Sequence, residues 1–557
     1  MEINLKTTPF SRRDSYLSLA AEGDRLLLRN LRNKWGMERL GHIAFGEDVT
    51  FSATPWCINI SGNAGSGLAY LNGQGGLVLS LNGLACSFVM NENQKGYGYC
   101  YADGSFMLLS LQGMAFIKVD PVIGSGDLTL AQSVANNFQV PAQCGLNITA
   151  MDDKCLVYIE VSDEEHIYRR PDIDVNRDVE AIRGQWEAYL AETPRLPDEW
   201  KTLGQQAWYL LWSCYVPREG FLAYDAVLMS KGCMAAVWSW DHCFNALALS
   251  YRSEKEAIEQ FLLHFELQTE TGAIPDFLTA KQIQWLVAKP PIHGWCFLSL
   301  MERFDLPEEL LKRVYAFLTK WTEWYFETRD TDGNGIPEYM MGVDSGWDNS
   351  TLFDCPGPVE SPELLAFLVI QTEALSVAAG KLHDADMAKT WMNKSNALLD
   401  VLFSHFWKDN GLIARNAATG IETQCPTSLL PFVSLVLGKR FNAGYLDDTV
   451  RRLHENYRTS FGFATEAPSS PLYQSDGYWR GPIWAPVSYL LADGLYEAGY
   501  IKEAVGAAED FCKMLSKADG FYENYDALTG EGLCDTGYTW TASVALLFIY
   551  RFLADER

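Results

Sequence analysis

The chain has 557 residues, of which 48% are hydrophobic and 21% charged, a composition typical of a globular protein with more than one hydrophobic core. Its formal net charge of −27 makes nucleic acids and anionic membranes poor partners, because a polyanion would be repelled. The first residues, Met1-Glu-Ile-Asn-Leu-Lys6, contain no apolar signal core, and no run of about 18 apolar residues follows. We therefore expect a soluble, cytoplasmic protein.

The N-terminal third alternates short apolar runs with turns, from residue 1 to about residue 173. Examples of the runs are Gly76–Leu81, Ser105–Ser110 and Lys154–Val161, in which apolar side chains recur at every second position. Glycine turns such as Asn72-Gly73 and Asp103-Gly104 separate them. This pattern is typical of an antiparallel β-sandwich.

The character of the sequence then changes to helical periodicity. Residues 178–190 form a charged, helix-compatible stretch that we interpret as a linker helix. After Pro197 apolar residues recur with helical spacing to the end of the chain, which predicts twelve helices. They lie near residues 197–216, 240–251, 253–269, 293–303, 306–327, 360–380, 382–407, 425–437, 443–456, 481–498, 499–517 and 538–554.

Twelve helices joined alternately by tight and long connections are what an (α/α)6 toroid requires. The sequence therefore predicts a mainly α protein with an all-β N-terminal domain. We place the β-sandwich and its linker at residues 1–185 and the (α/α)6 barrel at residues 186–557.

Polar, tryptophan-rich runs fall on long loops that lead into the even-numbered helices. These runs are Trp238–Asp241, Lys289–Trp295, Asp344–Ser350, Tyr478–Trp484 and Tyr522–Gly532. In a toroid such loops share one face, and loops on a rigid scaffold are where sites usually lie. We therefore expect them to converge on one funnel.

Two of these loops are acidic, which favours glycoside hydrolysis. That reaction needs one carboxylic acid to protonate the leaving oxygen and a second carboxylate that attacks or activates water. In the first loop Asp344 and Asp348 compete for the role of acid, and in the second Glu523, Asp526 and Glu531 compete for the role of base. Spacing alone does not choose between them, because a loop aspartate is commonly a turn former.

Several of these runs resemble segments of known inverting (α/α)6 glycosidases, the group that includes trehalases and glycoside hydrolase family 63. Ser345-Gly-Trp-Asp-Asn349 is similar to their S-G-x-D segment, and Glu523-Asn-Tyr-Asp526 to their E-x-Y-D/N segment. The remaining similar segments are Tyr478-Trp-Arg-Gly-Pro-Ile-Trp-Ala-Pro486, Trp240-Asp241 and Lys289-Pro-Pro291. Their order and spacing also agree, over residues 235–540.

The resemblance implies that Asp348 is the general acid and Glu523 the general base. The implied enzyme is an inverting, exo-acting α-glycoside hydrolase, an α-glucosidase for short oligosaccharides or small glucosides. Inversion requires the two carboxyl groups to lie about 6.5–9.5 Å apart, so that water fits between them. The expected substrate-binding residues are Trp240, Asp241, Trp347, Asn349, Trp479, Arg480 and Trp484.

Upstream of Asp348 lies a sequence that copies the first half of a calcium-binding EF-hand loop. Its candidate ligands are Asp330, Asp332, Asn334, the carbonyl of Ile336, and Glu338. The twelfth position holds Met341 where an EF-hand needs glutamate, so only a smaller cage closed by Glu338 is expected. The alternative is an ordinary Asx/Gly turn. No other cofactor is expected, and a calcium ion would be structural.

Other functions remain open at this point. The same toroid architecture also serves glycoside phosphorylases and polysaccharide lyases, and a non-catalytic carbohydrate-binding protein would need only the aromatic and amide groups. The sandwich has no evident catalytic residues, and we expect it to cover one side of the toroid or to lend a loop to the funnel. The sequence does not indicate an oligomeric state.

Overall fold

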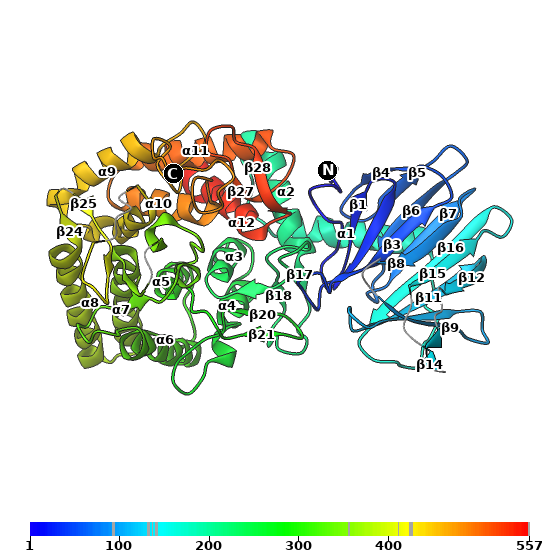
Figure 1. The fold of residues 1–557 in the computed structure, drawn as a ribbon, viewed down its shortest axis with the longest axis horizontal. Helices are drawn as coiled ribbons and strands as arrows, with labels where there is room; N and C mark the ends of the chain where they lie inside the picture. The colour runs from blue at the N-terminus through cyan, green and yellow to red at the C-terminus, as the bar shows by residue number, and fades with distance from the viewer. Residues whose placement is uncertain are drawn as a thin grey trace.

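In the computed structural model, a β-rich N-terminal region stands beside a helical toroid (Figure 1). The structure describes residues 1–91, 95–130, 134–135, 138–139, 143–354, 357–409, 411–422 and 427–554. The predicted fold class, a β-sandwich followed by an (α/α)6 toroid, is confirmed.

Two antiparallel sheets form the N-terminal region. The six-stranded sheet has the order β1-β2-β3-β8-β15-β12, and the eight-stranded sheet has the order β4-β5-β6-β7-β16-β11-β10-β9. The apolar runs expected from period-two alternation form β7, β10 and β16, whose inward side chains are buried between the sheets. The bounds are β1 Leu17–Glu22, β2 Arg25–Asn30, β3 Arg39–Phe45, β4 Thr50–Ala53, β5 Ile58–Ser61, β6 Ser66–Leu71, β7 Leu77–Asn82, β8 Cys86–Met90, β9 Gly96–Cys100, β10 Phe106–Ser110, β11 Ala115–Ile123, β12 Ser125–Leu130, β13 Val134–Ala135, β14 Phe138–Gln139, β15 Cys144–Thr149 and β16 Lys154–Ser162.

A single helix, α1 (Val175–Ala191), connects the two regions where a linker helix was expected. The Asp174 side chain accepts a hydrogen bond from the backbone N–H of Arg177 and so caps its first turn. Its buried Trp186 packs edge-on against Trp212 of the toroid, with ring centroids 5.4 Å apart. The predicted boundary after residue 185 falls inside this helix, and its exact position stays a prediction.

The toroid is a double ring of helices. The inner helices are α3, α5, α7, η5, α10 and α12, and each contacts the next until α12 contacts α3 again. These are the even-numbered segments of the sequence pattern, and they are apolar on every side because they are covered on every side. The bounds are η1 Asp198–Trp200, α2 Lys201–Ser213, α3 Asp241–Leu249, α4 Glu254–Leu262, η2 Phe265–Leu267, α5 His293–Arg303, α6 Glu308–Thr328, η3 Gly342–Ser345, η4 Thr351–Phe353, α7 Pro362–Lys381, α8 Ala385–Phe406, η5 Leu430–Arg440, α9 Ala443–Tyr457, α10 Ala485–Glu497, α11 Ile501–Lys517, α12 Thr539–Phe548 and η6 Ile549–Leu553.

The eighth predicted helix differs from expectation. Residues 425–426 of the predicted segment lie outside the described residues, and residues 430–437 belong to a 3₁₀ helix, η5, instead of an α-helix. Pro431 stands in its first turn, and Gly438 adopts a left-handed φ of 55° near its end, where the helical path is interrupted. Helical periodicity in the sequence does not distinguish these two helix types.

Short strands in the loops connect the helices on the face that carries the tryptophan-rich runs. They are β17 Tyr215–Val216, β18 Ala226–Val227, β19 Val237–Trp238, β20 Phe277–Leu278, β21 Ile283–Gln284, β22 Glu338–Tyr339, β23 Val359–Glu360, β24 Trp407–Lys408, β25 Gly411–Leu412, β26 Arg415–Asn416, β27 Tyr522–Tyr525 and β28 Gly532–Thr536.

One helix in the described part of the chain, α7, is long and apolar enough to cross a membrane by length and composition. However, 83% of its most apolar window is buried inside the protein, which is what an inner toroid helix requires.

Candidate active site

Three of the predicted loops are tied directly to one another. The side-chain amide of Asn349 donates to the carbonyl of Gly477 at 3.0 Å and accepts from the backbone N–H of Trp479 at 2.9 Å. Ile483 and Tyr525 exchange two backbone hydrogen bonds, of 2.7 and 3.0 Å. The loops that carry Asp348, Trp479 and Glu523 therefore form one surface, although well over 100 positions separate the first from the last in the sequence.

Glu523 lies on β27 and is only 6% exposed. Its Oε1 accepts a hydrogen bond from the hydroxyl of Tyr478 at 2.8 Å, and its Oε2 lies 3.4 Å from the backbone N–H of Asp535. Burial raises the pKa of Glu523 to about 7, against the opposing effect of these hydrogen-bond donors. This carboxyl group therefore changes its protonation state near neutral pH.

Tyr478 is held in an unusual conformation for this contact. Its φ is +62°, in the left-handed region that a bulky residue rarely adopts. The chain turns at Gly477 just before it, and the indole N–H of Trp484 donates to the Tyr478 carbonyl at 3.0 Å. Because such a conformation costs of order 1–3 kcal/mol and persists at functional sites, we regard Tyr478 as a positioning residue for Glu523.

Asp348 lies at the open side of the site, where its side chain is 36% exposed. Protein atoms on its other sides raise its pKa by desolvation, and the Lys289 ammonium, 3.7 Å from Oδ1, opposes that shift. Lys289 is itself fixed, because its Nζ donates to the carbonyl of Val343 at 2.8 Å. Lys289 was known from the sequence only as part of a motif, and the structure makes it the cationic neighbour of the predicted acid.

Of the three competing carboxylates, Asp344 and Asp526 hold their own loops, and Glu531 is exposed at the surface. Asp344 is buried and accepts hydrogen bonds from Arg329 at 3.2 Å and from the backbone N–H groups of Met340 and Ala288. In the second loop, Oδ1 of Asp526 accepts from two backbone N–H groups of its own turn. These contacts favour Asp348 and Glu523 as the reactive pair, and those roles stay predictions.

An unbroken series of indoles lines the site. Trp479 stacks on Trp484 with ring centroids 3.8 Å apart and 7° between the planes, and on its other side it stacks on Trp347 at 4.8 Å. Trp540, which the sequence did not single out, meets Trp484 and Trp240 edge-on at 5.5 and 5.9 Å. These apolar rings exclude water from the neighbouring carboxyl groups and so desolvate them.

The guanidinium group of Arg480 is already engaged by other protein groups. Its Nε donates to the carbonyl of Asn349 at 2.8 Å, and its terminal nitrogen pairs with Asp354. It therefore fixes the segment that follows Asp348.

Two further acids lie beside Lys289 and have unsatisfied oxygens. Asp241 and Asp276 are both buried, and among the described residues Oδ2 of Asp241 and Oδ1 of Asp276 find no hydrogen-bond partner. Burial raises the pKa of Asp241 to about 8 and that of Asp276 to about 6, while Lys289 opposes both shifts. A buried polar atom without a partner is costly, and the hydroxyl groups of a bound sugar would satisfy these two oxygens. Asp276 belongs to none of the motifs and was missed.

The predicted calcium ligands lie together in the loop after α6. One carboxylate oxygen from each of Asp330, Asp332 and Glu338 lies within 4.8 Å of the others. Hard oxygen ligands suit calcium, so the donor set fits that ion. The amide oxygen of Asn334, however, already accepts from the backbone N–H of Ile336 at 2.8 Å, and Asp330 accepts from the N–H groups of an Asx/Gly turn. Calcium binding therefore stays a prediction.

Because the loop carries a calcium-type donor set, we expect 1 mM CaCl₂ to raise the melting temperature of the protein by a few degrees relative to EGTA. At 100-fold excess over Kd, a ligand that binds only the native state adds about 2.7 kcal/mol. Scanning calorimetry of the wild type and of Asp332→Asn measures this, with 1 mM MgCl₂ as the ion control. If calcium did not change the melting temperature of the wild type, the loop would be an ordinary Asx/Gly turn.

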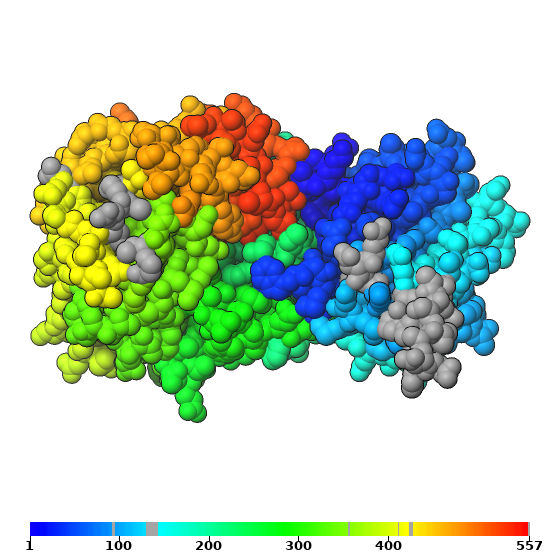
Figure 2. Space-filling model, viewed as in Figure 1, coloured from blue at the N-terminus to red at the C-terminus, as the bar shows by residue number. Residues whose placement is uncertain are grey.

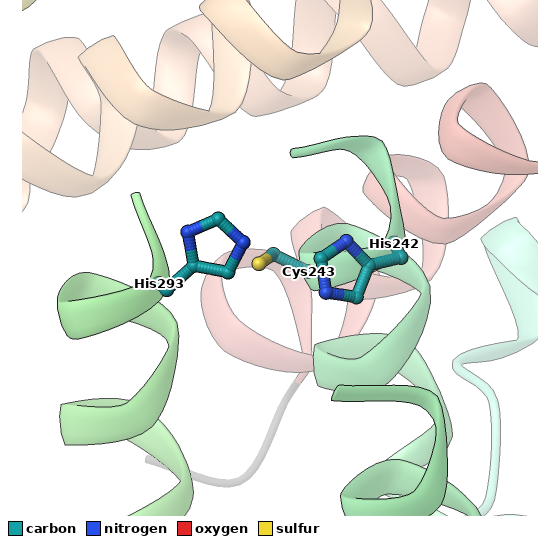
Figure 3. A group of neighbouring side chains, drawn as sticks. All are labelled: His242, Cys243 and His293. Carbon is teal, nitrogen blue, oxygen red and sulfur yellow. The ribbon is translucent and has the colours of Figure 1, made fainter. Parts of the chain in front are cut away.

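A second cluster of potential ligands is buried beneath the Trp238–Asp241 run. Figure 3 shows His242 and Cys243 on one helix facing His293 on another, and their donor atoms lie within 4.8 Å of one another. Burial lowers the pKa of His242 to about 4, so its ring is neutral, and its nitrogens lie 3.0 and 3.3 Å from the carbonyls of Trp238 and Phe261. These side chains therefore form a neutral, partly hydrogen-bonded part of the core between α3 and α5.

Comparison with known proteins relates most of the helical region to a known family. The family of mannosylglycerate hydrolase MGH1-like glycoside hydrolase domains matches residues 234–541, more than half of the chain. The mannosylglycerate hydrolase MGH1 of Selaginella moellendorffii is 22% identical over 412 residues, which cover 58% of this chain and 82% of that protein.

Solved structures extend the likeness in fold. A family 63 mannosylglycerate hydrolase from Thermus thermophilus, in complex with glucose, covers 63% of this chain and 100% of its own, with 20% identity and a TM-score of 0.54. A bacterial glucoamylase complexed with acarbose covers 98% of this chain and 94% of its own, with 11% identity and a TM-score of 0.66. The second match includes the N-terminal β region, and at these identities both show the fold alone.

Proposed function

The chain belongs to the family of MGH1-like glycoside hydrolases, and from that premise we propose that it is an inverting, exo-acting hydrolase of small α-glycosides. Its proposed substrates are α-glucosides or α-mannosides with a short, glycerate-type aglycone, supported by the named activity of the relatives. The predictions from the sequence that the chain is a glycosidase and is related to family 63 are confirmed, whereas the predicted general α-glucosidase activity is not.

The observation that carries this proposal is a buried carboxyl group, Glu523, held by Tyr478 beside an indole-lined site that also contains Asp348. The Tyr478 hydroxyl donates to Glu523, and burial together with the charges of Glu523 and Asp348 raises its pKa. The separation of the two carboxyl groups, predicted as about 6.5–9.5 Å, stays a prediction for the substrate complex.

In the proposed reaction, ionised Glu523 removes a proton from a water molecule as that water attacks the anomeric carbon. Asp348 simultaneously gives its proton to the departing glycosidic oxygen, the C–O bond breaks, and the sugar leaves with inverted configuration. Tyr478 keeps Glu523 in place, and Lys289 holds Asp348 and stabilises its carboxylate after the proton has left. The unsatisfied oxygens of Asp241 and Asp276 accept hydroxyl hydrogens of the cleaved sugar.

A phosphorylase would need a phosphate site where Glu523 stands. A buried carboxylate repels phosphate, so the site favours water as the attacking group. A binding protein would not need two carboxyl groups with raised pKa values on separate loops.

We expect the first sugar released from an α-glycoside to be the β-anomer. A panel of α-linked disaccharides, glucosylglycerate and mannosylglycerate, followed by proton NMR within the first minutes before mutarotation, measures both specificity and stereochemistry. Parallel reactions with and without phosphate distinguish hydrolysis from phosphorolysis. Release of the α-anomer would overturn the mechanism, and hydrolysis confined to disaccharides would overturn the proposed aglycone.

A further inference from the structure

The N-terminal domain extends a loop over the toroid, which we call the finger and define as residues 31–38. It connects β2 to β3. Figure 2 shows a blue part of the N-terminal domain lying over the green surface of the toroid. The finger lies outside the matched family region, residues 234–541.

The base of the finger is fixed to the toroid by ionic and apolar contacts. Arg32 forms a bidentate pair with Glu219, at 2.6 and 3.0 Å. Leu31 and Tyr16 share a buried apolar cluster with toroid residues that include Val237 and Leu278. Such a two-hydrogen-bond pair is geometrically specific, and the shared core resists separation, so the finger has a defined position relative to the site.

Lys34 fixes the tip of the finger against the toroid. Its Nζ lies 3.2 Å from the ring centroid of Phe277, 4.3 Å from that of Trp238 and 3.8 Å from that of Trp35, in a cage where no described residue accepts a hydrogen bond from it. Burial lowers the pKa of Lys34 to about 7, against the opposing effect of Asp276, and the ammonium form is attracted to the faces of these rings. Phe277 is adjacent to Asp276, and Trp238 begins the run that ends at Asp241, so the cage adjoins the two acids assigned to the sugar.

Packing accounts for Trp35 only in part, because one face of its ring meets Lys34 while most of the residue is exposed. Its side chain is 65% exposed, and it touches Phe277 only edge-on, with centroids 6.5 Å apart. Its φ is +63°, followed by Gly36 at +84°, so a bulky residue occupies a left-handed position that glycine or asparagine would fill without strain. A strained, exposed indole fixed beside a sugar site indicates a contact with ligand.

We propose that Trp35 forms the outer wall of the aglycone subsite, so that the N-terminal domain contributes to substrate recognition. Lys34 acts as a positioning residue that holds the indole against the rim. This inference rests on the proposed function. It concerns the part of the substrate beyond the scissile bond, because the proposed function already assigns Asp241 and Asp276 to the cleaved sugar.

The test compares two substrates of the same sugar: the α-glycoside that the wild type hydrolyses, and the corresponding α-glycosyl fluoride, which has no aglycone. For Trp35→Gly we expect kcat/KM for the glycoside to fall about tenfold, mainly through KM, because loss of one aromatic contact costs about 1.4 kcal/mol. Hydrolysis of the fluoride should stay within about twofold of wild type. Glycine relieves the backbone at φ +63°, so misfolding does not explain the loss.

Trp35→Phe should recover part of the glycoside activity, and Lys34→Met should raise KM for the glycoside alone, with rescue by Lys34→Arg. Tyr99→Ala, which removes a partly exposed aromatic from β9, serves as the matched control and should change neither rate. Equal rates for Trp35→Gly and wild type on both substrates, or an equal fall on both, would overturn the inference. A wild type inactive on both substrates would instead refute the proposed function.

Discussion

Replacement of Glu523 by glutamine is expected to reduce hydrolysis of both an α-glycoside and an α-glycosyl fluoride severely. The amide keeps the size of the side chain and can still accept from the Tyr478 hydroxyl, but it cannot take a proton from water. General-base catalysis contributes about 10²–10⁴-fold, and we expect a loss of kcat at the upper end of this range on both substrates. Initial rates, measured with a sensitive fluoride-ion or glucose assay, test this directly.

The same substitution should stabilise the fold above neutral pH. Glu523 has a folded pKa of about 7, above the 4.5 of an exposed glutamate, so the folded state binds the proton more tightly than the unfolded state. Its contribution to stability is therefore most favourable at low pH and declines as pH rises between these two values. At about 1.4 kcal/mol per pKa unit, the cost at pH 8 is on the order of 3 kcal/mol.

Calorimetry should therefore show a higher melting temperature for Glu523→Gln than for wild type at pH 8, and little difference at pH 4.5. For the wild type, kcat/KM on the fluoride should increase with pH and level off above an apparent pKa near 7, because only ionised Glu523 is active. Asp526→Asn is the matched control in the same loop and should retain most of the activity. If the Glu523→Gln enzyme kept wild-type turnover, the general base would have to be another residue.

The fold was largely predictable because its pattern is periodic. The inner helices recur with 3.6-residue spacing, and α5 occupies the predicted residues 293–303. Alternation of tight and long connections then placed the tryptophan-rich runs on one face, and the contacts of Asn349 with the loop at Trp479 support that arrangement.

Residues brought to the site only by tertiary contacts could not be predicted. Asp276 belongs to no motif, and it becomes a candidate because it lies 3.9 Å from Lys289 with an unsatisfied oxygen. Lys34 lies more than 200 residues from Phe277, whose ring it contacts, and no spacing in the sequence reports such a contact. Likewise, Asp344 and Asp348 are equivalent by spacing, and only tertiary contacts separate their environments: Asp344 is buried and paired with Arg329, whereas Asp348 is partly exposed beside Lys289.

Asp348→Asn is expected to separate the two halves of the proposed reaction. An asparagine cannot protonate the leaving oxygen, so kcat for an α-glycoside, whose alkoxide leaves poorly, should fall about 10²–10⁴-fold. Fluoride leaves without a proton from Asp348, so kcat for the α-glycosyl fluoride should fall less than about tenfold. Glu523 remains to activate water, and the released sugar should still be the β-anomer by NMR.

This difference between substrates is the signature of a general acid and excludes a merely structural role. If Asp348 only held its loop through Lys289, its replacement would displace Lys289 from the Val343 carbonyl and reduce turnover of both substrates equally. Asp344→Asn provides that comparison, because Asp344 accepts from Arg329 and two backbone N–H groups. We expect it to lower stability and to reduce both activities in parallel. If Asp344→Asn lost activity on the glycoside alone and Asp348→Asn did not, Asp344 would be the general acid and Asp348 the residue that supports the loop.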